Sequence, residues 1–286
     1  MPHPLDAGPH HVTLNGAALV YHVHGAGPVL VALAGGPGFS WNYLRMPEVE
    51  AHATLVYLEL VGTGASARLA PAEYGRARDV ADVEALRVHL GLDRIGLLGH
   101  SAGGFVAQQY AVTHPDRVSH LVLYDTSPTN GPELGTSMQT ELAARMHHAW
   151  AKSAAAALDA LFSRPVTDEE AAALGRDIMP LYVYDHDASP ELTQQILARA
   201  QLSAARLQAP RVPFDFRPQL AELRTPALVI VGARDFICAP RLAELIAGSL
   251  PGARLVVLPR SGHFGHVEEP HAFAAAIASF LSKTAR

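Results

Sequence analysis

Short apolar runs recur along the chain, separated by longer stretches in which apolar residues return with a helical period. Most of the short runs are continuously apolar, which is typical of strands covered on both faces, as in a parallel sheet. The runs predict strands at residues 18–24, 28–33, 54–60, 94–99, 119–125, 226–232 and 253–259.

Helical patterns fill several of the intervals between these strands. They predict helices over residues 79–91, 101–114 and 240–250. In the first, apolar residues at positions 80, 83, 86 and 90 line one face. Because strands and helices alternate, we expect an α/β fold with a doubly wound, mostly parallel sheet and right-handed crossovers.

This alternation stops between residues 127 and 217, where the chain is rich in alanine and has no buried-strand run. The pattern predicts helices over residues 140–162 and 167–179, and Thr167 with Glu170 resembles a capping box. The simplest interpretation is a core domain formed by residues 1–126 and 218–286, with residues 127–217 inserted as a helical cap.

Composition narrows the classes of function. Of 286 residues, 49% are hydrophobic and 17% charged, which allows a sizeable core, and the net charge of −5 argues against nucleic-acid binding. Cys238 is the single cysteine, so no intrachain disulfide forms. The first residues lack a secretory-signal pattern, and no apolar run approaches the length of a membrane span. We expect a cytoplasmic protein with a small-molecule or short-peptide substrate and no membrane or nucleic-acid partner.

Gly99-His100-Ser101-Ala102-Gly103 fits the G-x-S-x-G pattern of a nucleophile elbow, with a predicted strand before it and a predicted helix after it. A sharp turn between strand and helix holds the serine in a strained conformation, so its neighbours must be small. The alternative is an ordinary glycine-rich turn. The flanking elements favour Ser101 as a nucleophile.

A serine nucleophile needs a base and an acid that orients the base, in the chain order Ser, acid, His for this type of elbow. Asp235 follows one predicted strand and His263 follows the next, so both lie at the carboxyl edge where ligands bind in open α/β sheets. Asp125, which ends the strand at 119–125, is the alternative acid. His266 is the alternative base.

A developing oxyanion requires backbone N–H donors. Ala102 follows the nucleophile and supplies one. The loop from Ala34 to Gly38 follows a predicted strand, and its glycines let the backbone approach a ligand closely. We predict Gly36 as the second donor, with Gly35 as the alternative.

These segments resemble the α/β-hydrolase family and, within it, the proline iminopeptidase branch. The resemblance rests on residues 34–44, 59–66, 99–104, 232–240 and 261–270. It implies that Ser101, Asp235 and His263 are the nucleophile, acid and base. The chain departs from that branch at Ala34 in place of histidine, Glu59 in place of aspartate, and Val61 and Ala65 in place of an aromatic residue and arginine.

Aminopeptidases of that branch use carboxylates of the cap to hold the free amino group of the substrate. Their Trp-Glu pairing is not evident here, since Ala151 follows Trp150. The carboxylates available in residues 127–217 include Glu133, Glu141, Glu169, Glu170, Asp185, Asp187 and Asp215.

Two further patterns resemble a cofactor-binding motif and a metal site without meeting the requirements of either. Residues 56–67 imitate a dinucleotide fingerprint, with Asp82 at the expected distance, but Pro71 interrupts the helix that the motif requires. Paired histidines at positions 10–11, 22/24 and 147–148 have no carboxylate at metal-ligand spacing. We therefore expect neither a cofactor nor a metal.

The sequence predicts a serine hydrolase that cleaves an amide or ester bond through an acyl-enzyme, as the resemblance to proline iminopeptidase implies. An esterase, a lactonase, or a biosynthetic cyclase or acyl transferase is the alternative, favoured by an apolar cap pocket without a carboxylate. A non-catalytic binding protein on the same scaffold is the third class.

Overall fold

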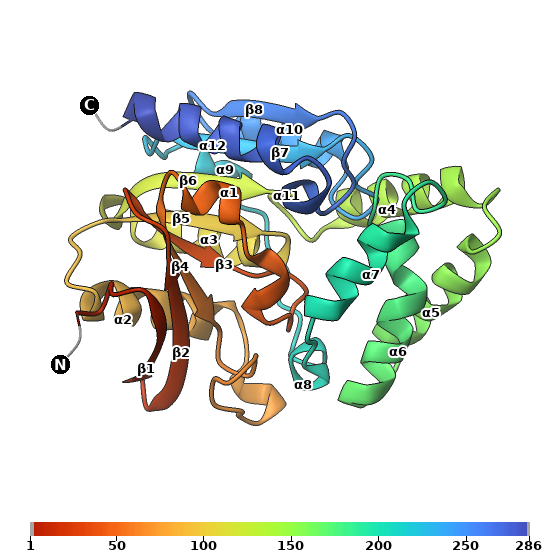
Figure 1. The fold of residues 1–286 in the computed structure, drawn as a ribbon, viewed down its shortest axis with the longest axis horizontal. Helices are drawn as coiled ribbons and strands as arrows, with labels where there is room; N and C mark the ends of the chain where they lie inside the picture. The colour runs from red at the N-terminus through yellow and green to blue at the C-terminus, as the bar shows by residue number, and fades with distance from the viewer. Residues whose placement is uncertain (1–2, 285–286) are drawn as a thin grey trace.

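The computed structural model describes residues 3–284 and has an eight-stranded sheet between two layers of helices (Figure 1). The strand order is β1-β2-β4-β3-β5-β6-β7-β8. β2 is antiparallel to both β1 and β4, and the other neighbours are parallel, as predicted for an α/β fold. The strands are β1 (Gly8–Leu14), β2 (Ala17–His24), β3 (Val29–Leu33), β4 (Thr54–Glu59), β5 (Ile95–His100), β6 (Val118–Tyr124), β7 (Ala227–Gly232) and β8 (Arg254–Leu258).

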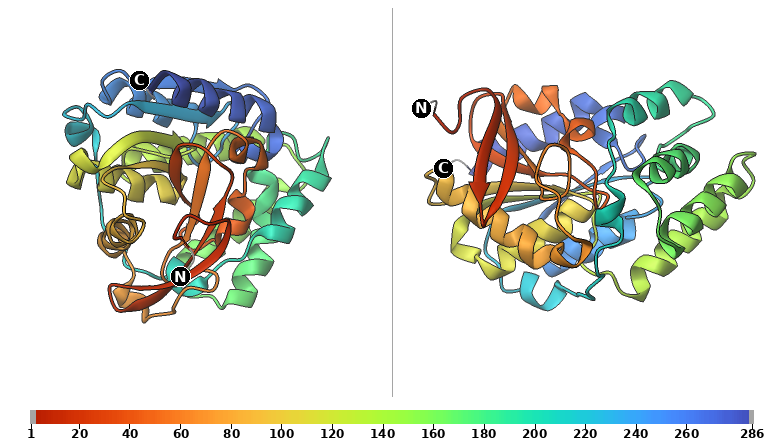
Figure 2. Two further views of the ribbon diagram at one scale, coloured as in Figure 1. Left: turned by 60° about the vertical axis from the view of Figure 1, so that its left-hand side comes forward. Right: turned by 90° about the horizontal axis from the view of Figure 1, so that it is seen from below.

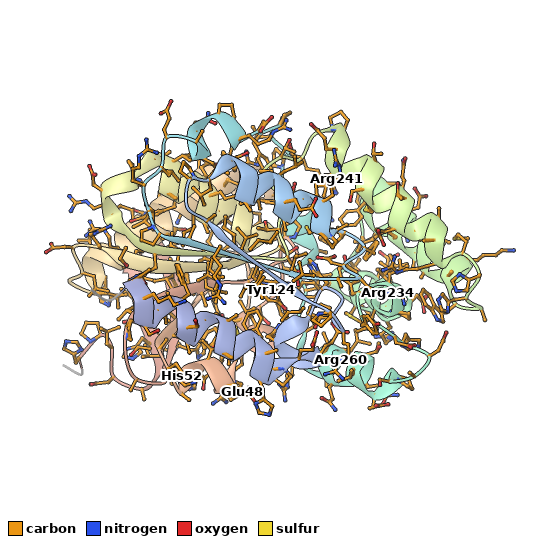
Figure 3. The ribbon with its side chains drawn as sticks, turned by 90° about the horizontal axis from the view of Figure 1, so that it is seen from above. Glu48, His52, Tyr124, Arg234, Arg241 and Arg260 are labelled. Carbon is orange, nitrogen blue, oxygen red and sulfur yellow. The ribbon has the colours of Figure 1, made fainter. Side chains whose placement is uncertain are left out.

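Successive residues of the central strands enter two hydrophobic clusters on opposite faces of the sheet. In β3, Val31 and Leu33 belong to one cluster, and Leu30 and Ala32 belong to the other. This explains why the strands read as continuous apolar runs. The first cluster is completed by α2 (Arg76–His89), α3 (Ala102–Thr113), α9 (Arg217–Leu220) and α10 (Pro240–Ser249), and the second by α1 (Pro47–Glu50) and α12 (Pro270–Thr284). Figure 3 shows the side chains that fill both layers, with Tyr124 in the interior.

All seven predicted strands are present, and every end lies within one residue of its prediction. β1 was not predicted. Its side chains alternate between half-buried and exposed, so it lacks a continuous apolar run. Asn15 and Gly16, with φ of 48° and 77°, form the two-residue turn that joins it to β2. An Asn-Gly pair is a strong hairpin signal, and it is the feature of the sequence from which this strand could have been predicted.

Residues 132–207, which lie between β6 and β7 in the chain, are helical and gather at one end of the molecule, beyond the sheet (Figures 1 and 2). Their helices are α4 (Pro132–Arg145), α5 (Ala151–Ser163), α6 (Asp168–Ile178), α7 (Pro190–Arg199) and α8 (Ala204–Leu207). The capping box is confirmed, because Thr167 Oγ1 accepts the Glu170 N–H while the Glu170 carboxylate accepts the Thr167 N–H.

The prediction of one helix over residues 140–162 is wrong, because the chain turns between α4 and α5. At this turn His148 Nδ1 lies 2.7 Å from Asp187 Oδ2, and Trp150 Nε1 donates to Asp187 Oδ1 at 3.0 Å. Asp187 lies far along the chain, so a local helical pattern could not indicate this contact. α5 then packs beside α6.

The remaining elements are short. They are the 3₁₀ turns η1 (Trp41–Leu44), η2 (Pro71–Glu73), η3 (Pro115–Arg117) and η4 (Met179–Leu181), together with helix α11 (Gly265–Glu268). Within residues 3–284, every helix falls short of the length and apolar character that crossing a membrane requires.

Candidate active site

Ser101 stands between β5 and α3 with φ of 52° and ψ of −120°, a conformation that L-residues rarely adopt. Three bonds hold this turn. The Ser101 N–H donates to Tyr124 O at 3.0 Å, and Ser101 O accepts the Gly104 N–H at 2.9 Å and the Thr126 hydroxyl at 2.7 Å. The structure therefore has the strained strand-to-helix turn that the sequence predicts.

The neighbours of Ser101 must be small, because larger side chains there would overlap the surrounding atoms. A Cβ on Gly99 would lie 2.6 Å from Gly103 O, and one on Gly103 would overlap Leu33 O. On the opposite side, a Cβ on Gly35 would lie 2.7 Å from the Ser101 Cβ. The loop after β3 thus passes directly over the serine.

His263 and Asp235 are brought together at the carboxyl ends of β8 and β7. His263 Nδ1 lies 2.7 Å from Asp235 Oδ2, and both side chains are buried. The other oxygen, Asp235 Oδ1, accepts the N–H groups of Ile237 and Cys238 at 2.9 and 3.0 Å. With Nδ1 directed at the carboxylate, Nε2 is the ring nitrogen that remains for proton transfer.

The alternative acid, Asp125, ends β6 with φ of 44° and makes a different set of contacts. Its Oδ1 accepts the Gly232 N–H at 2.8 Å, and its Oδ2 has no hydrogen-bond partner among residues 3–284. Burial, together with the negative charge of Asp235, raises the pKa of Asp125 well above its usual range. Asp125 therefore joins the ends of β6 and β7 through the Gly232 N–H.

The alternative base, His266, is engaged elsewhere. Its Nδ1 lies 2.9 Å from the Tyr124 hydroxyl, and its Nε2 lies 2.8 Å from Tyr43 O. Burial lowers the pKa of His266 to about 4, so the ring is neutral at pH 7. Both nitrogens are committed to hydrogen bonds within the core.

The loop over the serine contains Gly35 and Gly36, the two glycines predicted as possible oxyanion donors. Gly35 donates its N–H to the Tyr43 hydroxyl at 2.6 Å, so that donor is already in use. Gly36 has φ of 114°, which favours glycine. The geometry therefore favours Gly36 over Gly35 beside Ala102, the first residue of α3.

An apolar cavity of about 40 Å³ lies between this loop and the helices of residues 151–207. It carries no charged side chain. Its lining residues are Gly36, Phe39, Leu161, Phe162, Gly175, Ile178, Met179, Tyr182, Leu202, Leu207 and Phe264. Phe264 follows the candidate base, and Gly36 is the candidate oxyanion donor, so the cavity adjoins the site.

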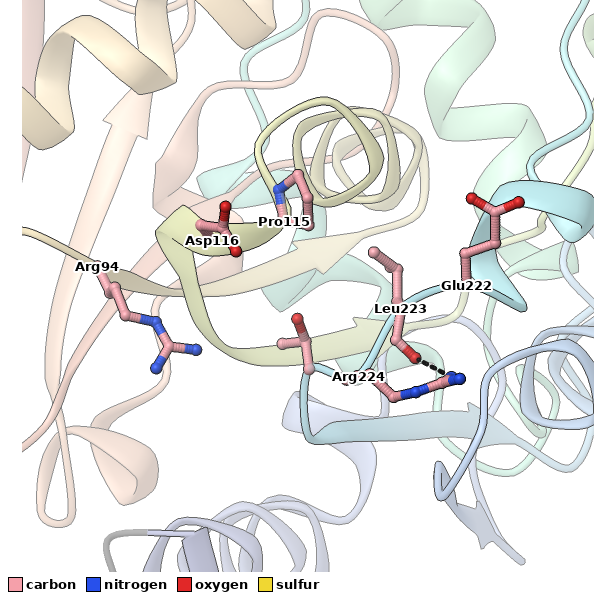
Figure 4. A pocket seen from close by; sticks show the side chains of 7 residues that line it. Arg94, Pro115, Asp116, Glu222, Leu223 and Arg224 are labelled. Atoms are coloured by element: carbon pink, nitrogen blue, oxygen red, sulfur yellow. Dashed lines mark hydrogen bonds between the residues drawn. The ribbon is translucent and has the colours of Figure 1, made fainter.

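A second cavity, of about 450 Å³, opens at the amino-terminal ends of β5, β6 and β7 (Figure 4). Arg94 and Arg224 line it together with Asp116 and Glu222, so its charges balance. It lies at the strand edge opposite the serine, and no predicted site residue reaches it.

The carboxylates of residues 127–217 that the sequence offers as candidates for binding a substrate amino group do not line the apolar cavity. Most of them have partners of their own. These are Arg217 for Glu133 and Asp215, Arg145 for Glu141, Arg164 for Glu170, His148 and Trp150 for Asp187, and the Ala188 N–H for Asp185. Glu169 is exposed.

His100, Asp125 and His263 place potential metal-ligand atoms within 4.8 Å of one another. They do not fit a metal site, because both nitrogens of His100 are in use: Nδ1 lies 2.8 Å from the Tyr43 hydroxyl and Nε2 lies 2.9 Å from His263 O.

The hydrogen bond from His100 to His263 O joins the turn of Ser101 to the loop that carries the candidate base. Sequence reasoning missed Tyr43 and His100 as parts of the site, since no local motif marks a buried hydrogen bond.

The loop at residues 62–67, which imitates a dinucleotide fingerprint, is filled by Glu59. This carboxylate accepts the Ala65 N–H, and the Gly62 N–H donates to Ala67 O at 2.7 Å. An acid in the loop and a turn closed on itself leave no cradle for a pyrophosphate.

Known proteins resemble the chain over most of its length. The profile of a family described as alpha/beta hydrolase fold matches residues 28–270. The proline iminopeptidase PfmaB of Pestalotiopsis fici is 28% identical over 281 residues, covering 95% of this chain and 99% of the relative. A pimeloyl-acyl-carrier-protein methyl ester esterase of Edwardsiella ictaluri is 29% identical over 274 residues, covering 92% and 97%. The crystal structure of a hydrolase from Pseudomonas aeruginosa PA01 has a TM-score of 0.73 and 30% identity, covering 96% and 98%. The chain belongs to the α/β-hydrolase family.

Proposed function

We propose that the protein is a serine hydrolase in which Ser101 attacks an ester or amide carbonyl and forms an acyl-enzyme. The observation that carries the proposal is the buried His263–Asp235 pair, 2.7 Å apart, at the same sheet edge as the strained turn of Ser101. A neutral imidazole with Nδ1 held by a carboxylate is the base that such a serine needs.

In the proposed first step, His263 Nε2 takes the proton of the Ser101 hydroxyl while Oγ forms a bond to the carbonyl carbon. The carbonyl oxygen becomes an oxyanion, held by the N–H groups of Gly36 and Ala102. The tetrahedral intermediate collapses, the bond to the leaving group breaks, and His263 delivers the proton to it. Asp235 orients the ring and stabilises its charged form.

Water completes the cycle in the second step. His263 takes a proton from the water, whose oxygen attacks the acyl carbon. The acid leaves as the proton returns to Ser101 Oγ. These steps need no metal and no organic cofactor.

The cavity supports a substrate with a small, neutral and apolar acyl group. Phe39, Phe162 and Met179 line it and offer no partner to a free amino group. An amine buried there would lose its hydration without gaining a carboxylate. We therefore propose esters of apolar acids ahead of peptides with a free N-terminus, and we propose residues 127–217 as the cap that supplies most of these walls.

Aminopeptidase activity is the second candidate, favoured by the 28% identity to a proline iminopeptidase. Hydrolysis of p-nitrophenyl butyrate and of prolyl-p-nitroanilide, by wild type and by Ser101→Ala, separates the two. We expect turnover of the ester only, lost in the variant. Turnover of the anilide alone would overturn the substrate class, and turnover that survives in Ser101→Ala would overturn the nucleophile.

A further inference from the structure

A directed chain of hydrogen bonds crosses the core behind the candidate site. It starts at the Gly35 N–H, passes through the Tyr43 hydroxyl at 2.6 Å and His100 Nδ1 at 2.8 Å, and ends where His100 Nε2 meets His263 O at 2.9 Å. It thus joins the loop over the serine, the residue before the serine and the loop that carries the base.

The direction of each bond follows from its chemistry. An amide N–H only donates, so the Tyr43 oxygen accepts from Gly35, and the hydroxyl proton reaches His100 Nδ1 when the single proton of a neutral ring is on Nε2. A carbonyl oxygen only accepts, so His100 Nε2 carries the proton that reaches His263 O. One arrangement, with a neutral His100, satisfies all three bonds.

Burial keeps both side chains in the required state. Tyr43 is 2% exposed and His100 is 1% exposed. Burial raises the pKa of the Tyr43 hydroxyl above its usual value and lowers the pKa of His100 well below its own. At pH 7 the hydroxyl is therefore protonated, and the imidazole carries a single proton.

We propose that Tyr43 is a positioning residue, which sets the place of the oxyanion-binding loop relative to the base through its hydroxyl. The Gly35 N–H, tied to Tyr43, belongs to the Ala34–Gly35 peptide. The adjacent Gly35–Gly36 peptide carries the candidate donor N–H, so the orientation of that donor depends on how the Ala34–Gly35 peptide is held. This inference rests on the proposed function, because it assumes that Gly36 binds the oxyanion.

Tyr43→Phe is the sharpest variant, because it keeps the ring against Phe39, His100 and Phe264 and removes one oxygen. The link from Tyr43 O to His266 Nε2 also survives, since it uses the backbone. What changes is that the Gly35 N–H and His100 Nδ1 lose their buried partner.

Tyr57→Phe is the matched control. Tyr57 is also fully buried, and its hydroxyl also accepts a backbone N–H, from Met46 at 2.9 Å, while donating to Glu50 at 3.0 Å. Its bonds do not touch the loop over the serine. A purely structural cost of losing a buried hydroxyl should therefore be similar in the two variants.

The readout is the rate at which a fluorophosphonate labels Ser101, because the phosphoryl oxygen uses the same donors as the oxyanion and no substrate need be known. We expect Tyr43→Phe to slow labelling by about 10- to 100-fold, somewhat less than the loss of one whole donor, and Tyr57→Phe to leave it unchanged. With p-nitrophenyl butyrate, kcat should fall by a similar factor while KM stays within about two-fold.

The outcomes are distinct. Labelling of Tyr43→Phe at the wild-type rate overturns the positioning role alone, and so does equal slowing in both tyrosine variants. Wild type that is not labelled overturns the nucleophile and this inference together. If Tyr43→Phe does not fold, His100→Asn removes the link to His263 O, together with the ring contacts to Tyr124 and Phe264. Unchanged labelling of that variant overturns the chain as a connected device.

Discussion

Two buried aspartates at neighbouring strand ends differ in the donors that surround them. Asp235 accepts from two backbone N–H groups and pairs with His263, whereas Asp125 accepts from Gly232 alone. Since a buried carboxylate needs hydrogen-bond donors, Asp235 is the better placed of the two to orient the base. The pKa of Asp125, raised well above its usual range by burial and by the charge of Asp235, agrees with this division.

This division predicts opposite results for two conservative changes. Asp235→Asn should lower kcat by about 10³- to 10⁴-fold, because the amide no longer orients His263. Asp125→Asn should leave kcat nearly unchanged, since the new amide oxygen still accepts the Gly232 N–H. Steady-state kinetics of both variants with one ester would check this, and comparable losses would contradict it.

At the scale of elements, the strand-to-helix turn of Ser101 depends on close approach between α3 and β3. Gly103, in the first turn of α3, lies against the carbonyl of Leu33. We expect Gly103→Ala to cost about 3 kcal/mol of unfolding free energy, because the new methyl group forces the helix away from the sheet.

Gly135 in α4 is the matched control, because its Cβ position is open. Gly135→Ala should raise the unfolding free energy by about 0.5–1 kcal/mol through helix propensity. Urea unfolding of both variants measures the contrast. A Gly103→Ala protein as stable as wild type would refute the close approach.

Glu268 in α11 ties two loops together, because its carboxylate accepts the N–H groups of Tyr184 and Gly262. Burial raises its pKa to about 7. Between the unfolded pKa near 4.5 and about 7, the folded state binds more protons than the unfolded state. The unfolding free energy should therefore fall as pH rises through this window, by up to about 3 kcal/mol.

Glu268→Gln tests this pH dependence. The difference in unfolding free energy between wild type and variant should shrink or reverse from pH 4.5 to pH 7.5, since the glutamine does not titrate. Urea titrations at four pH values in that range would measure it. A difference that stays constant with pH would rule out Glu268 as the titrating group.

At the scale of the whole molecule, a buried ion pair joins the helices of residues 127–217 to α2, in the helical layer that covers one face of the sheet. Arg206 in α8 makes two bonds to Asp79 in α2, at 2.9 and 2.8 Å, and a third to Val61 O at 3.1 Å. Both side chains are nearly inaccessible. Neighbouring backbone bonds from Ser40 to Gln201 and from Ser203 to Gly38 hold the same segment beside the loop over the serine.

Removing one partner of this pair should be costly. Arg206→Met leaves Asp79 buried without its partner, and we expect a loss of about 3–5 kcal/mol in unfolding free energy. Adding Asp79→Leu should recover much of it, because the pair is then replaced by apolar side chains. Chemical unfolding of the single and double variants tests this, and additive losses would show that the two residues are not coupled.

How much could be predicted from the sequence depends on the range of the interaction. The seven strands β2–β8 could be predicted to within one residue, because most of them are buried on both faces and therefore have continuously apolar sequences. β8, at the edge of the sheet, is partly exposed but keeps an apolar sequence. The turn at Ser101 could be predicted because its requirement for small neighbours is local. The half-exposed strand β1 has no continuous apolar run, but the Asn15-Gly16 turn that follows it is a local signal for a hairpin.

The sequence by itself determined the α/β fold, seven of the eight strands, and the residue types that reach the carboxyl edge of the sheet. The tertiary structure alone decided which acid lies against His263, which glycine N–H the Tyr43 hydroxyl occupies, where the helix over 140–162 breaks and which cap carboxylates are already paired. The physical reason is that each of these depends on hydrogen bonds between residues distant in the chain, whose distance and direction exist only after the sheet has brought them together.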